Sequence, residues 1–197
     1  DELNQSYNTL QTQTNATDAE MAGLEQSLKN IYANNYGESF EDIATSMAEV
    51  KKQTGLAGEE LEKATENALA LRDTFEFEVV ESTRAADMMM KQFGITSDEA
   101  YNLIAQGAQN GLNKNDNLLD SINEYSVHFQ QLGFDADEMF NMFSNGAQTG
   151  VFDIDKLGDA VKEFGIRVKD GTADDAFEEL GLNAEQLKQA FTEGGES

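Results

Sequence analysis

Apolar side chains recur along the first part of the chain at alternating intervals of four and three residues. The series is Leu3, Tyr7, Leu10, Thr14, Thr17, Met21, Leu24, Leu28 and Ile31, in which only the two threonines are not apolar. Alternation of this kind is the a/d pattern of a coiled coil. It predicts an amphipathic heptad helix over residues 1–35, and the apolar members form a candidate stripe for self-association. A helix that packs on the chain's own domain would show the same pattern, so both alternatives stay open.

Beyond residue 36 a glycine motif recurs between helical stretches. It reads glycine, a bulky apolar residue, two small or polar residues and two acidic residues, as in GLAGEE from Gly55, GITSDE from Gly94 and GFDADE from Gly133. The spacing is constant, because 94 − 55 and 133 − 94 both equal 39. A related motif, GLNAEQL, begins at Gly181 and is out of register, because 181 − 133 equals 48. A fixed internal period is the signature of a repeat architecture.

The residues around each motif predict a helical hairpin. After the glycine comes a polar residue suited to cap a helix, such as Thr96, and acidic side chains follow at the positive end of the helix dipole. A first helix is expected from Asp98 to Gln109. Second helices are expected to begin with caps at Asp116 and Asp155.

Glycines are expected to end these helices. The second helices are predicted to run to Leu132 in one copy and to Phe164 in the next, and each is followed by a glycine. Glycine is favoured there because it adopts the left-handed backbone conformation that ends many helices. We therefore interpret four glycines as structural repeat joints: Gly55, Gly94, Gly133 and Gly181.

The predicted fold class is all-α. It comprises the coiled-coil-like helix, αα-hairpin repeats of about 39 residues packed as a compact helical or short solenoid domain over residues 36–192, and the start of a linker at 193–197. The stretch TFEFEVVE from Thr74 alternates apolar and acidic residues, which is typical of a strand. Because the repeat places Val79 at the start of a helix, an extended approach to that helix is favoured over a short strand.

Composition limits the partners. The net charge is −25, and a chain this acidic repels nucleic acid and anionic lipid. No apolar run approaches the ~20 residues that span a bilayer. There is no proline, which suits closely spaced helices because proline breaks helix interiors. These features favour proteins, cations or basic surfaces as partners. The alternative is that the charge only keeps an elongated chain in solution, and that alternative is favoured.

Candidate chemistry is sparse. Asn113, Asn115, Asn117 and Glu124 match part of a calcium-loop template, but Leu118 stands where the loop requires glycine. In the next copy, Asp153, Asp155 and Gly158 match, but the last ligand position holds Phe164. Capping of helices explains these residues better than metal binding. His128 and the run Met88–Met90 are interpreted as structural, so no catalytic, cofactor or metal site is expected.

Two long stretches carry a family resemblance: SFEDIATSMAEVKKQTGLAGEELEKATENALAL from Ser39 and LLDSINEYSVHFQQLGFDADEMFNMFSNGAQTGVFDIDKLGDAVKEFGIRVKDG from Leu118. They resemble the core region of phage tail tape-measure proteins of tailed phages and prophages of Gram-positive bacteria. The resemblance begins near Phe40 and covers most of the chain.

The resemblance implies a fragment of a structural protein that sets tail length and occupies the tail tube until DNA ejection. The implied partners are other copies of the chain, tail tube proteins and tail-assembly chaperones. The implied location is the interior of the virion tail, and the host cytoplasm during assembly. We expect no enzyme activity and no membrane contact from this fragment. The glycine-rich repeats predict a compact module, so the ruler-like portion is expected in the N-terminal heptads.

Two other functions share this fold prediction. One is a generic α-helical-repeat scaffold for protein binding, encoded by a prophage. The other is a fragment of a cell-wall hydrolase, which would require a convergent set of acid–base or metal-binding residues.

Overall fold

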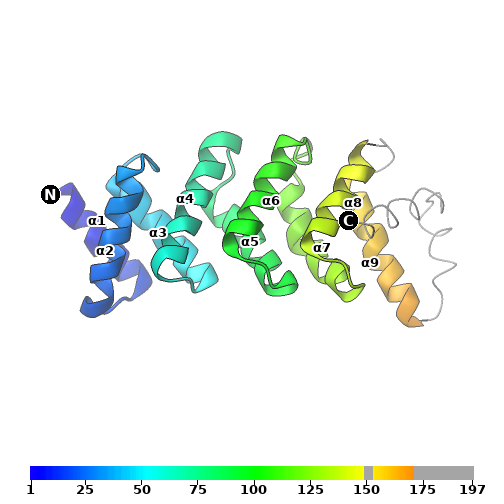
Figure 1. The fold of residues 1–197 in the computed structure, drawn as a ribbon, viewed down its shortest axis with the longest axis horizontal. Helices are drawn as coiled ribbons and strands as arrows, with labels where there is room; N and C mark the ends of the chain where they lie inside the picture. The colour runs from blue at the N-terminus through cyan, green and yellow to red at the C-terminus, as the bar shows by residue number, and fades with distance from the viewer. Residues whose placement is uncertain (149–152, 171–197) are drawn as a thin grey trace. The chain divides into compact units, whose positions relative to one another are not determined.

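The computed structural model describes residues 1–148 and 153–170, and its regular elements there are helices (Figure 1). The all-α class is thereby confirmed. The helices are α1 (Glu2–Thr14), α2 (Asp18–Ala33), α3 (Phe40–Thr54), α4 (Gly58–Phe75), α5 (Val79–Phe93), α6 (Ser97–Gln109), α7 (Leu118–Gln131), α8 (Ala136–Gln148) and α9 (Ile154–Asp170).

The helices fall into two series with the predicted period. The odd-numbered helices α3, α5 and α7 begin at Phe40, Val79 and Leu118, and 79 − 40 and 118 − 79 both equal 39. The even-numbered helices α4, α6 and α8 begin at Gly58, Ser97 and Ala136, and 97 − 58 and 136 − 97 equal 39 as well. Three consecutive αα-hairpins therefore keep one register.

The alternating TFEFEVVE stretch contains no strand. Helix α4 continues to Phe75, Glu76 takes a left-handed conformation with φ 64°, and α5 begins at Val79. The helix start at Val79 that the repeat predicted is confirmed. The extended approach is shorter than expected, because α4 contains Thr74 and Phe75.

The expected single helix over residues 1–35 is wrong, because the structure divides it into α1 and α2. Asn15 takes a left-handed conformation with φ 55°, and Thr17 then caps α2 in a reciprocal capping box with Glu20. The threonines that interrupt the apolar series thus lie where one helix ends and the next begins. Helices α1 and α2 precede α3 and α4 by nearly one period, since 40 − 2 equals 38 and 58 − 18 equals 40. This segment is therefore itself a hairpin of the repeat.

Helix α9 corrects two further expectations. It begins at Ile154, three residues before the position that the period gives, and it runs through Gly165 to Asp170 instead of ending at Phe164. A glycine inside a helix costs about 1 kcal/mol relative to alanine, which a packed face can outweigh. The buried face of α9, which includes Leu157 and Val161, packs on α7.

The chain forms two compact units. The first contains residues 1–87 and 96–101, and the second contains 88–95 and the described residues from 102 onward. In the first unit α1 packs on α3 and α2 packs on α4, so successive hairpins lie side by side. The predicted boundary at residue 35 therefore does not separate compact units. In the second unit α7 packs on α9 and α8 also contacts α9.

Candidate interaction surfaces

The described joint glycines all have left-handed backbone. The φ angles are 71° at Gly55, 69° at Gly94 and 90° at Gly133, and a Cβ at each would meet no other atom within 4 Å. The backbone conformation, and not crowding, is therefore what favours glycine. Gly181 lies outside the described residues.

After two of these glycines, the next helix begins with a capping box, in which a capping residue and a glutamate exchange hydrogen bonds. The Thr96 hydroxyl accepts a hydrogen bond from the Glu99 backbone N–H at 3.2 Å, and Asp135 accepts one from the Glu138 N–H at 2.8 Å. Both glutamates accept a bond in return from the backbone N–H of the capping residue. At the third joint, Ala57 stands at the cap position and no side chain caps α4.

The candidate self-association stripe lies mostly inside the chain. Leu10, Leu28 and Ile31 have no exposed surface, Met21 and Leu24 are buried, and Leu3 and Tyr7 are half-buried. Because α1 and α2 pack on α3 and α4, the structure supports the alternative in which this pattern packs on the chain's own domain. The five buried members of the stripe are covered by other helices of the same chain.

Two of the calcium-loop candidates, Asn113 and Asp153, accept hydrogen bonds at the starts of helices. The Asn113 side chain accepts a bond from the Leu118 N–H at 3.1 Å, whereas Asp116 has a left-handed backbone conformation with φ 56°. Asp153 accepts a bond from the Lys156 N–H at 2.8 Å. The expected caps at Asp116 and Asp155 are therefore wrong by a few residues. Within the described ranges, no group of His, Asp and Glu could hold a metal ion.

Asp155 belongs instead to a contact between α7 and α9. The Tyr125 hydroxyl lies 2.9 Å from a carboxylate oxygen of Asp155 and 2.7 Å from one of Asp159, and it donates its single hydrogen to one of them at a time. Burial and these two carboxylates raise the pKa of Tyr125 well above its usual range. A Cβ at Gly158 would overlap with the Tyr125 ring, so glycine is what lets the two helices approach.

His128 and the run Met88–Met90, which the sequence singled out, are buried or half-buried on their helices. His128 is half-buried on α7, and burial together with the nearby Lys162 lowers its pKa. Met89 is fully buried, and Met88 and Met90 are half-buried.

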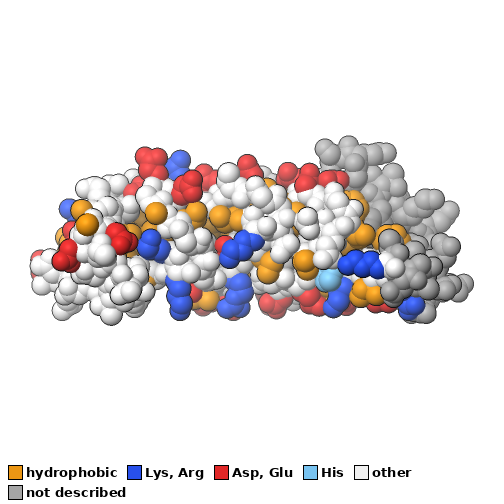
Figure 2. Space-filling model, turned by 90° about the horizontal axis from the view of Figure 1, so that it is seen from below, with side chains coloured by type: hydrophobic (Ala, Val, Ile, Leu, Met, Phe, Trp, Pro, Cys, Tyr) orange, Lys and Arg blue, Asp and Glu red, His pale blue; other side chains and the backbone are white. Residues whose placement is uncertain are grey.

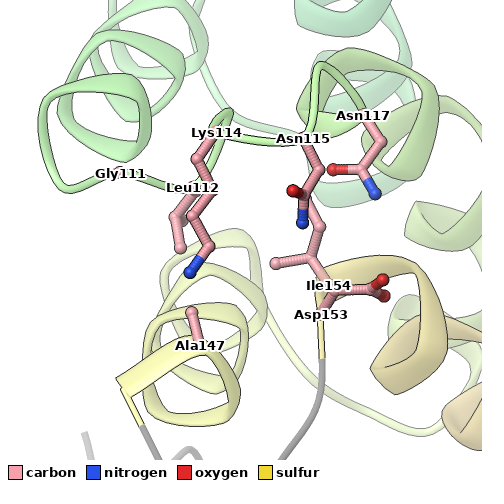
Figure 3. Close-up of a pocket in the computed structure, with 8 residues that line it drawn as sticks. All are labelled: Gly111, Leu112, Lys114, Asn115, Asn117, Ala147, Asp153 and Ile154. Carbon is pink, nitrogen blue, oxygen red and sulfur yellow. The ribbon is translucent and has the colours of Figure 1, made fainter. Parts of the chain in front are cut away.

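A small pocket in the second unit is lined by the α6–α7 connection, the end of α8 and the start of α9 (Figure 3). Lys114 and Asn115 extend toward it from the connection, and the Asp153 carboxylate is already the cap of α9. The lining residues are Gly111, Leu112, Lys114, Asn115, Asn117, Ala147, Asp153 and Ile154. One lysine, two amides and an engaged carboxylate do not form the paired acids that glycoside hydrolysis requires.

Amide–carboxylate bonds join successive even-numbered helices of the first unit, a feature that the sequence reasoning missed. Asn30 donates to Glu62 at 2.9 Å, Asn34 donates to Glu66 at 2.9 Å, and Asn67 donates to Asp98 at 2.8 Å. An amide leaves the charge of its carboxylate in place. These bonds therefore bridge neighbouring hairpins without neutralising the acidic surface.

The surface combines this acidity with few exposed apolar side chains. Figure 2 shows acidic, basic and apolar groups interspersed on one face. Among the described residues, the exposed large apolar side chains are Tyr32, Val80 and Ile166. Tyr32 lies against Phe40 with ring centroids 4.1 Å apart. The part of the chain that the structure describes has no helix long and apolar enough to cross a membrane.

The fold and its surfaces define an all-α repeat protein, and comparison with known proteins places it in a family. A model of phage-related minor tail proteins matches residues 29–196. A probable tape measure protein of Streptomyces phage phiC31 is 44% identical over 141 residues, which cover 70% of this chain and 19% of that protein. No solved structure matches the chain. The chain belongs to the phage-related minor tail protein family, and its resemblance to tape-measure proteins is confirmed.

This family membership makes the chain a structural protein of a phage tail. The chain spans about a fifth of the length of its phiC31 relative, since the match covers 19% of that protein.

Proposed function

We propose that the chain is part of a tape measure protein, whose total length sets the length of the tail and which occupies the tail tube until DNA ejection. The name of the phiC31 relative supports this proposal. The structural observation that carries it is the run of hairpins that begin at equal intervals along the chain. A chain built from equal units changes in length by equal steps, which is the property that a molecular ruler needs.

The partners in this proposal are other copies of the chain, the tail tube proteins and the tail-assembly chaperones. The strongly acidic surface favours protein contacts over contact with DNA, because the net charge of −25 repels phosphate. The protein would lie in the host cytoplasm during assembly and in the tail interior of the virion.

Removal of one repeat from the full-length phage gene tests the proposal. Deletion of residues 79–117 removes α5, α6 and the connection to α7, and keeps the register of the remaining helices. We expect shorter tails by electron microscopy. The step is about 58 Å if the deleted segment lies as a continuous helix along the tube, at about 1.5 Å per residue. It is about 10 Å if hairpins stack at the usual distance between packed helices.

Duplication of residues 79–117 is the matched control, and it should lengthen the tail by the same step. Tails of unchanged length in both variants, with the protein still incorporated, would contradict a role in length determination. The size of the step separately reports whether the repeats are folded back or extended in the tail.

A further inference from the structure

An aromatic pair lies on the surface of the first unit, where α2 is connected to α3. Tyr32 stands near the end of α2 and Phe40 is the first residue of α3, and their ring centroids are 4.1 Å apart with an angle of 30° between the ring planes. Phe40 therefore covers one face of the Tyr32 ring. Tyr32 is nevertheless 50% exposed, which is the largest exposed fraction among the large apolar side chains of the described residues. The other face of its ring is left to the solvent.

Acidic side chains flank this pair along the chain. Glu38 precedes Phe40 and Glu41 follows it, and both are exposed. From Tyr32 to Asp42 the sequence contains three acidic residues and no lysine or arginine. Asp42 already has a cationic partner, because Arg72 donates hydrogen bonds of 2.7 Å to both of its carboxylate oxygens. The charge at this surface is therefore carried by the two glutamates.

The Glu41 carboxylate is held in place without being neutralised. The Thr9 hydroxyl of α1 donates a hydrogen bond of 2.7 Å to one of its oxygens. A hydroxyl is a neutral donor, so the charge of the carboxylate is kept. A side chain that is already ordered loses less freedom when a partner binds, which lowers the entropic cost of binding.

The exposed ring and the carboxylates together favour a cationic ligand. The face of an aromatic ring is the negative side of its quadrupole, so it attracts a cation. Arginine suits this surface better than lysine, because its planar guanidinium stacks on a ring and its N–H groups also donate to a carboxylate. An anionic group would be repelled by Glu38 and Glu41.

The overall charge argues that this arginine comes from a different protein. The chain has 38 acidic and 13 basic residues, so two copies of it repel each other. A basic polypeptide is attracted over a longer range and is steered toward an acidic surface. A basic partner therefore fits this surface better than a second copy of the chain does.

We infer that the Tyr32–Phe40 pair, with Glu38 and Glu41 beside it, is a docking site for an arginine side chain in a basic segment of a partner protein. The inference goes beyond the proposed function, which gives classes of partner but assigns no surface of this chain to any of them.

An NMR titration of the complete chain tests the inference. The probe is a synthetic peptide of arginines separated by glycines, and matched peptides carry lysine or the neutral isostere citrulline in place of arginine. We expect the largest amide shift changes around Tyr32 and Phe40, and tighter binding of the arginine peptide than of the lysine peptide. The citrulline peptide should cause no change at this site. Binding should weaken as salt is added, since the site is exposed.

Variants separate the ring from the charge. Tyr32→Leu keeps an apolar side chain but removes the ring, so it should weaken binding of the arginine peptide by about two- to fivefold, the size of an exposed cation–π interaction. Tyr32→Phe keeps the ring and should bind like wild type. Glu41→Gln keeps an acceptor for Thr9 but removes the charge, so it should weaken binding and reduce its dependence on salt.

The matched control is Val80→Ala, which changes another exposed apolar side chain of the first unit and should leave the affinity unchanged. Circular dichroism checks that each variant keeps its helices. If Tyr32→Leu lost helicity, the comparison of Glu41→Gln with the control would still decide the result.

Three results would overturn the inference. The first is equal affinity of wild type and of folded Tyr32→Leu or Glu41→Gln for the arginine peptide. The second is a set of shift changes spread evenly over the acidic surface without a maximum at Tyr32. The third is the same local shift changes on addition of unlabelled chain alone, which would identify a second copy as the occupant. None of these results concerns tail length, so each can be told apart from failure of the proposed function.

Discussion

The first two hairpins of the first unit make the same turn with different chemistry. Between α1 and α2, Asn15 supplies the left-handed residue and Thr17 forms a full capping box with Glu20. Between α3 and α4, Gly55 supplies the left-handed residue and Ala57 provides no side-chain cap. The joint is therefore defined by its backbone conformation and not by glycine.

The comparison shows why a glycine motif locates three joints and misses the first. Asparagine is the residue after glycine that most readily adopts the left-handed conformation, since its short side chain can bond locally. If the first hairpin is a true member of the repeat, its side chains should stabilise the unit as those of the second hairpin do.

The largest effect is expected from the two hairpin cores. Leu28 of α2 and Leu61 of α4 are both almost completely buried, so Leu28→Ala and Leu61→Ala should each lower the free energy of unfolding by about 2–5 kcal/mol. Urea denaturation followed by circular dichroism measures this. Similar losses, each with one cooperative transition, would mean that α1–α2 is integrated in the unit. A separate early transition in Leu28→Ala would show an appended helix instead.

Substitutions at the two cap positions should change the stability by smaller amounts. The change should be destabilising at the first joint and stabilising at the second. Thr17→Ala removes the capping box and should cost about 1 kcal/mol. Ala57→Thr places threonine three residues before Glu60 and creates the missing box, so it should stabilise the protein by about 0.5–1 kcal/mol. Both are measured as shifts of the urea midpoint. A stabilising Thr17→Ala would contradict the account of the first joint.

The smallest effect concerns acid sensitivity of the second hairpin. Hydrogen bonding from Arg72 lowers the pKa of Asp42 below its ordinary value of 3.8. The stabilisation from this pair is therefore fully present above the ordinary pKa and is lost as the pH falls through the lowered one. Wild type should exceed Arg72→Gln in unfolding free energy by up to about 1 kcal/mol at pH 6, and the gap should narrow as the pH falls below 3.8 and Asp42 becomes protonated. A gap that does not narrow as the pH falls below 3.8 would rule out the ion pair as its cause.

The period and most helix starts could be predicted from the sequence, because three hairpins repeat the same joint. Helix α6 begins within one residue of the expected Asp98 and ends at the expected Gln109. The caps before α7 and α9 could not be assigned, since several polar neighbours stand in each loop and only the loop geometry selects Asn113 and Asp153.

One feature of the sequence indicates that α9 lies close to another helix. Gly158 occupies the repeat position of Leu119, and a glycine in place of a core residue points to a close neighbour. The identity of that neighbour, Tyr125, depends on tertiary packing that a local pattern does not contain. Likewise, Gly165 does not end α9, because burial of the helix outweighs the preference of glycine for helix ends.

The most direct test of the repeat account is one distance within the first hairpin. Spin labels at Gln5→Cys and Lys29→Cys, both at exposed positions, would report it in dilute solution. The hairpin predicts a separation of about 10–20 Å, within one or two helix diameters. A continuous heptad helix would separate the labels by about 36 Å along its axis, and a dominant distance of that size in the dilute chain would contradict the account.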